Sequence, residues 1–86
     1  MTTDDFLQGL RSGSGVNCIF RAGDLGGMIA VYPFNGVFVL HWEEYRDEEH
    51  RNRGDYRRDE MHRFEAAEDV LAFVERSGYP ASGFHS

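Results

Sequence analysis

The amino-acid sequence predicts a single α+β domain over residues 1–86, with a three- to four-stranded antiparallel meander, a C-terminal helix packed on one face and a short N-terminal helix. Three observations predict it. Apolar residues alternate along the stretches between Val16 and Tyr45, an Asn35-Gly36 dipeptide separates two of these stretches, and a helical apolar spacing runs over Ala66–Ser77. A partly open barrel, with the strands curled around the helix, is the alternative arrangement.

The first residues predict a short helix over Thr3–Ser12. A threonine at its start can accept a hydrogen bond from the first turn, where Asp4 and Asp5 suit the positive end of the helix dipole. The apolar stripe of this helix is narrow and consists of Phe6, Leu7 and Leu10.

Three strands are predicted next, over Val16–Ala22, Met28–Phe34 and Val37–Tyr45, with a glycine-rich turn at residues 23–27. Asn35 and Gly36 both tolerate the positive φ of a type I′ turn, which pairs Phe34 with Val37. Opposed residues point to the same face. The predicted core face therefore holds Val16, Cys18, Phe20, Ile29, Val31, Pro33, Phe38, Leu40 and Trp42.

Residues 46–63 carry six arginines and six acidic residues. At the end of this segment, Tyr56–Phe64 is predicted to be a fourth strand at the sheet edge or a mobile loop, because charge protects an edge from unwanted pairing. The helix over Ala66–Ser77 should lie across the core face, and it should end at Gly78 before Pro80.

The second face of the central hairpin is also apolar, although a half-exposed sheet normally alternates apolar with polar residues. Either the N-terminal helix covers it, or a partner protein or second copy of the chain does. Acidic residues follow where the third strand leaves the sheet. The predicted protein-binding residues are Tyr32, Phe34, Val37, Val39, His41, Glu43, Glu44, Asp47, Glu48 and Glu49.

No catalytic residue, metal or cofactor is predicted. Cys18 should face the core, where a thiol is inert. His41 and Glu43 share a strand face, and Glu48, Glu49 and His50 could complete a ligand set if the loop folds back, but no zinc-type spacing is present. A small metal- or nucleic-acid-dependent enzyme using His41 or His62 is kept as an alternative.

The net charge is −6, with nine arginines and no lysine. This acidity disfavours nucleic acid as a partner and favours a basic protein surface. The possible nucleic-acid patch is cancelled by interleaved acids; it consists of Arg51, Arg53, Tyr56, Arg57 and Arg58. An acidic start, a single cysteine and no membrane-length apolar run predict a cytoplasmic protein.

These features predict a small acidic, non-catalytic protein-binding module, of which an inhibitor of a basic or nucleic-acid-binding partner is one type. The alternative is a structural homo-oligomeric accessory protein, for example a homodimer, without an inhibitory role. In size, acidity, meander and closing helix the chain is similar in general build to bacterial and phage proteins of the inhibitor, immunity, counter-defence or anti-CRISPR type. That resemblance implies no role for any individual residue.

Overall fold

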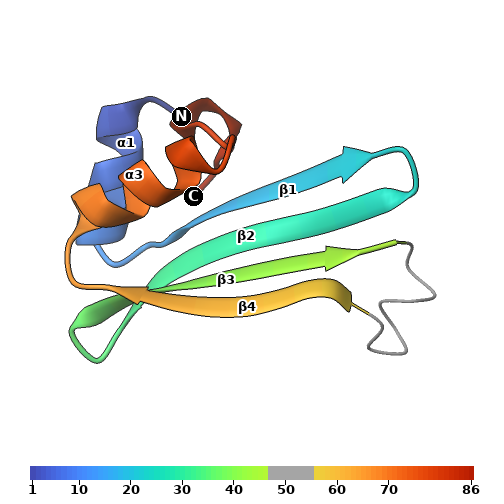
Figure 1. The fold of residues 1–86 in the computed structure, drawn as a ribbon. Coiled ribbons are helices and arrows are strands. Elements are labelled where there is room, and N and C mark those ends of the chain that lie inside the picture. Colours follow the sequence, from blue (N-terminus) through green and yellow to red (C-terminus); the bar gives the residue numbers. More distant parts are fainter. Residues whose placement is uncertain (47–55) are drawn as a thin grey trace.

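The computed structural model describes residues 1–46 and 56–86. The four strands form one antiparallel sheet in the order β1-β2-β3-β4, and both helices lie on the same side of it (Figure 1). This confirms the predicted α+β meander, and the sheet stays open, with β1 and β4 at its edges. The elements are α1 (Thr3–Arg11), β1 (Val16–Ala22), β2 (Leu25–Phe34), β3 (Val37–Tyr45), β4 (Tyr56–Phe64), α3 (Ala67–Arg76) and the 3-10 turn η1 (Ala81–Gly83).

The β2–β3 hairpin has the predicted turn and register. Asn35 and Gly36 have φ values of 50° and 82°, and Phe34 pairs with Val37. Because this register continues along both strands, Ile29 stands opposite Trp42 on the helix side of the sheet. The two faces of the hairpin are therefore divided as the sequence predicts.

The β1–β2 turn is shorter than predicted. It consists of Gly23 and Asp24, and β2 begins at Leu25 instead of Met28. Gly26 and Gly27 therefore belong to the strand. Large rings occupy the space that their missing side chains leave: the Phe20 ring lies over Gly27, and the Tyr45 ring lies over Gly26.

The core lies between the sheet and the helices, as predicted. Phe20 and Phe38 are partly buried at its margin, whereas Pro33 is exposed because it lies near the hairpin turn. The most deeply buried side chains come from both helices, the sheet and the C-terminal segment; they are Phe6, Leu10, Ile29, Val31, Leu40, Val70, Val74 and Phe84.

Helix α1 lies beside α3 on the core face, so the idea that it covers the second sheet face is wrong (Figure 1). The Phe6 and Phe84 rings meet edge to face at 5.1 Å, and both side chains are fully buried. Arg11 forms an ion pair with Glu68 at the helix surfaces. The ten-residue helix α3 is too narrow to cover four strands, and α1 is needed to complete the same layer.

The ends of these elements have identifiable hydrogen bonds. Thr2 Oγ1 accepts from the Asp5 N–H at 3.1 Å, as predicted for the helix start. Gly78, with φ 96°, ends α3, and the Tyr79 N–H donates to the Val74 carbonyl at 2.8 Å. In the part of the chain that the structure describes, no helix combines the length and apolar character needed to cross a membrane.

Candidate contact surface on the open sheet face

The sheet face opposite the helices, here called the open face, is not covered by any element in the described part of the chain (Figure 1). Four large apolar side chains on it are exposed: Ile19 by 73%, Met61 by 62%, Phe34 by 58% and Tyr32 by 39%. By strand register, the open face comprises Asn17, Ile19, Arg21, Met28, Ala30, Tyr32, Phe34, Val37, Val39, His41, Glu43, Asp59, Met61 and Arg63.

A groove runs over Val39 on this face. Val39 is only 4% exposed, although it lies outside the main core, because larger side chains surround it. Tyr32 and Arg63 are its partners on the neighbouring strands, and Phe34 and Met61 complete the lining. The volume is about 290 Å³, near the lower limit of roughly 300–1,000 Å³ for ligand pockets, so the groove suits a docked side chain better than a cofactor.

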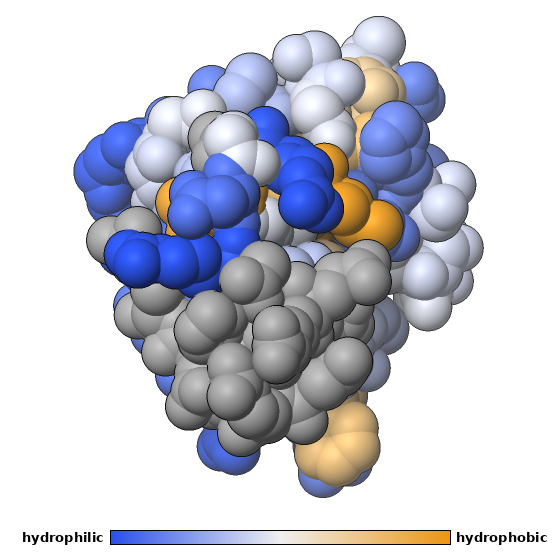
Figure 2. Space-filling model, turned by 90° about the vertical axis from the view of Figure 1, so that its right-hand side faces the viewer, coloured by the Kyte–Doolittle hydropathy of each residue, from blue (hydrophilic) through white to orange (hydrophobic). Residues whose placement is uncertain are grey.

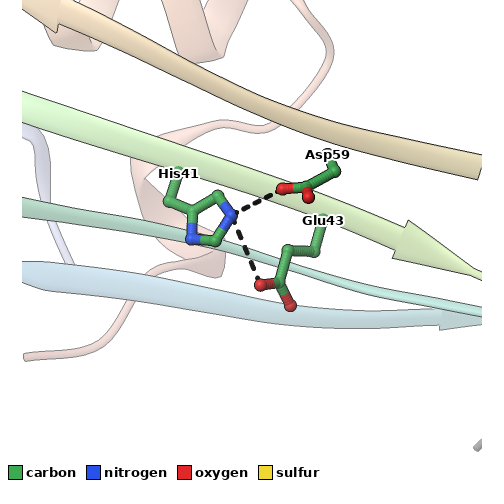
Figure 3. Close-up of side chains that lie close together, drawn as sticks. All are labelled: His41, Glu43 and Asp59. Atoms are coloured by element: carbon green, nitrogen blue, oxygen red, sulfur yellow. Dashed lines mark hydrogen bonds and ion pairs between the residues drawn. The ribbon is translucent and has the colours of Figure 1, made fainter. Parts of the chain in front are cut away.

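His41, Glu43 and Asp59 converge farther along the open face (Figure 3). His41 Nε2 lies 2.9 Å from Asp59 Oδ1 and 3.3 Å from Glu43 Oε1. The strands produce this arrangement: Glu43 is opposite Asp59 in the β3–β4 register, and His41 is two residues from Glu43 and so shares its face. The His41 and Glu43 side chains are mostly buried, at 26% and 15% exposure.

The carboxylates on the helix side are neutralised differently. Arg58 Nε lies 3.0 Å from Glu60 Oε2 and 3.6 Å from Glu44 Oε2. Its guanidinium also lies over the Trp42 ring, and His62 Nε2 approaches Glu60 Oε1 at 2.9 Å. Among the side chains that the structure describes, no arginine is paired with Glu43 or Asp59.

Six of the predicted protein-binding residues lie together on the open face: Tyr32, Phe34, Val37, Val39, His41 and Glu43. Glu44 lies on the helix side, where Arg58 pairs with it, so it does not belong to this surface. Asp47, Glu48 and Glu49 lie outside the described residues, as do His50, Arg51 and Arg53. Arg58, like Glu44, points to the helix side, where its guanidinium lies over the Trp42 ring.

The surface predicted from the sequence did not include three β4 residues that lie on the open face: Asp59, Met61 and Arg63. A signal for them exists, because successive side chains of a strand point to opposite faces, so that a strand over Tyr56–Phe64 puts these three on one face. Their neighbours could not be assigned, since the segment between β3 and β4 contains no turn motif that determines the pairing register. The β3–β4 pairing also has an irregularity at Glu44 and Tyr45.

The end of the sheet at the β1–β2 turn is mostly hydrophilic in the described part of the surface, with small apolar areas among the hydrophilic ones (Figure 2). Asp24 and Arg46 approach each other there at 4.0 Å.

On the helix side of the sheet, Cys18 is buried as predicted, and burial raises the pKa of its thiol. Burial also raises the pKa of Tyr79, and the nearby Glu44 adds to that shift.

Comparison with known proteins found no matching family model, no similar curated protein and no similar solved structure.

Proposed function

We propose that this chain is a non-catalytic protein-binding module that docks a basic protein partner on its open face. The single observation that carries this is the group of four exposed apolar side chains on a sheet face that no described element covers. Exposed apolar side chains that lie close together, as Tyr32, Phe34 and Met61 do around the groove, are typical of interaction sites. The groove over Val39 offers a place for an apolar side chain of the partner to anchor.

The carboxylates on the open face and the net charge of the chain favour a basic protein as the partner. Glu43 and Asp59 border the apolar residues, and no described arginine neutralises them. A lysine or arginine on the partner would therefore meet two carboxylates beside the groove whose described partner is a histidine, His41, and not an arginine. The chain's net charge of −6 would also attract a basic partner over longer distances.

The same charge disfavours a second copy of the chain as the occupant, since two copies would each bring −6 to the contact. An inhibitor that blocks the nucleic-acid-binding surface of a basic protein fits this chemistry. The lone thiol of Cys18, buried and without a disulfide, suits the cytoplasm as the place where this occurs.

The test compares partner retention by two variants. Tyr32→Asp and Phe34→Asp together place two charges on the exposed apolar surface, whereas Ala72→Asp adds one charge on the exposed side of α3 as a control for acidic substitution elsewhere. The wild-type chain and the control should retain the same stoichiometric basic protein from lysate of the source cell, and the double variant should lose it. The purified pair should then bind more weakly as salt rises.

Two results would contradict the proposal. One is a partner that the double variant retains as well as the wild type does. The other is a stable dimer of the purified chain, measured by light scattering, that dissociates in the double variant. The second result would assign the open face to self-association instead.

A further inference from the structure

We propose that His41, Glu43 and Asp59 bind one divalent transition-metal ion, of which Zn²⁺ is the best example. The three residues supply one imidazole nitrogen and two carboxylate oxygens, which are the donors that zinc accepts in proteins. The inference does not rest on the proposed docking function, because it concerns the purified chain alone.

One donor-atom separation in this cluster equals that of a zinc site, and the separation of His41 Nε2 and Asp59 Oδ1, which are hydrogen-bonded, is shorter than a bound ion requires. Zinc bonds of about 2.0–2.2 Å in a tetrahedron place neighbouring donors about 3.3–3.6 Å apart. The observed separation of His41 Nε2 and Glu43 Oε1 is 3.3 Å, and that of Nε2 and Asp59 Oδ1 is 2.9 Å. All three donor atoms lie within 4.8 Å of one another. Small rotations of the Asp59 side chain, which is 58% exposed, would open the space for the ion.

The electrostatics of the cluster also favour a cation. Two carboxylates approach one imidazole on a partly buried surface, and no described arginine neutralises them. The cluster on the helix side shows the contrast, since Arg58 lies between Glu44 and Glu60 there. A metal ion at His41 would supply the positive charge that arginine supplies on the other side of the sheet.

Strand pairing holds the backbone of the three proposed ligands in place. His41 and Glu43 lie on β3, which is paired on both sides, and Asp59 lies directly opposite Glu43 on β4. Ligands held on paired strands need little rearrangement on binding. Three protein ligands leave the fourth tetrahedral position to water or to a side chain of a bound protein.

The test titrates Zn²⁺ into the metal-free chain by calorimetry and measures stoichiometry by equilibrium dialysis. We expect one Zn²⁺ per wild-type chain. Removing a residue that merely orients a metal ligand costs about 10- to 100-fold in affinity, so His41→Asn, Glu43→Gln and Asp59→Asn should each weaken binding by at least about 10-fold. His62→Asn is the matched control, because it removes the other histidine–carboxylate pair, and it should leave affinity unchanged.

A second readout locates the ion. Zn²⁺ should shift the NMR signals of the His41 ring nitrogens and leave those of His62 in place. The proposal is overturned if the wild type takes up no Zn²⁺, or if His41→Asn binds it as tightly as the wild type. The docking variant Tyr32→Asp, Phe34→Asp should bind Zn²⁺ normally, so failure of one proposal is distinguishable from failure of the other.

Discussion

The guanidinium carbon of Arg58 lies 4.3 Å from the centre of the Trp42 ring, on the helix side of the sheet. Trp42 is 4% exposed, and it also meets the Phe73 and Tyr79 rings edge to face. Arg58 thus closes one side of an aromatic cluster while pairing with two carboxylates. A residue of the charged segment is therefore part of the packing that holds β4 to the domain.

Replacing Arg58 by alanine should destabilise the fold by about 1 kcal/mol, because a cation–π contact at a partly exposed site contributes about 0.5–1 kcal/mol and exposed ion pairs add little. Arg58→Lys should recover only part of this loss, since lysine lacks the planar group that stacks on the ring. Urea unfolding followed by the fluorescence of the single tryptophan measures both variants. An Arg58→Ala variant as stable as the wild type would show that the contact is not formed in solution.

Phe84→Ala should be among the most destabilising substitutions in the chain. The side chain is fully buried against Phe6, and removing a buried phenylalanine costs about 3–5 kcal/mol. A double-mutant cycle with leucine at both positions should give a coupling of about 0.5–1.5 kcal/mol for the ring pair. A Phe84→Ala cost under about 1 kcal/mol would mean that the C-terminal segment is not docked on α1.

Gly27→Ala should destabilise the sheet, although alanine is normally better accepted than glycine in a strand. A Cβ at this position would meet the Phe20 ring and would lie 2.7 Å from the Glu43 carbonyl oxygen. The resulting overpacking should cost about 1–3 kcal/mol. Gly26→Ala is the matched comparison, because its Cβ would meet only the Tyr45 ring, at 3.0 Å or more. Equal unfolding free energies for the two variants would contradict this account.

Stability should fall at alkaline pH. Burial raises the pKa of the Cys18 thiol above its ordinary value of 9.0, and burial and Glu44 raise that of Tyr79 above 10.0. The folded state therefore holds these protons more tightly than the unfolded state. Their contribution is complete below the unfolded pKa values and is lost as pH rises through the folded ones. Urea unfolding between about pH 8 and pH 11 should show a shallower decline in Cys18→Ala and in Tyr79→Phe.

The hairpin could be predicted from the sequence because Asn35-Gly36 determines both the turn and the register of Phe34 with Val37. The placement of α1 could not be predicted, because its short apolar stripe fits either sheet face equally well. The deciding factor is that the helix layer must be wide enough to cover the sheet, and Phe6 of α1 packs against Phe84 in that layer. The proximity of Asp59 to His41 depends on the β3–β4 register, which residues far apart in the chain determine. The exposed apolar residues of the central hairpin were predictable, whereas in the histidine–carboxylate cluster only His41 and Glu43, which share a strand face, could be placed together.

The two edges of the sheet differ in a way that limits how copies of the chain could join. Asn17 on β1 exchanges backbone hydrogen bonds with His85, both at 2.7 Å, so that part of the β1 edge is occupied. The backbone N–H and C=O groups of Ile19 and Arg21 also point away from β2, as those of Asn17 do, because the direction of these groups alternates along an antiparallel strand. The β4 edge is instead dense in charge, which discourages pairing. Edge-to-edge pairing between copies of the chain would therefore join two β1 edges and stop at a dimer. A filament could not grow, because the β4 edges would not pair.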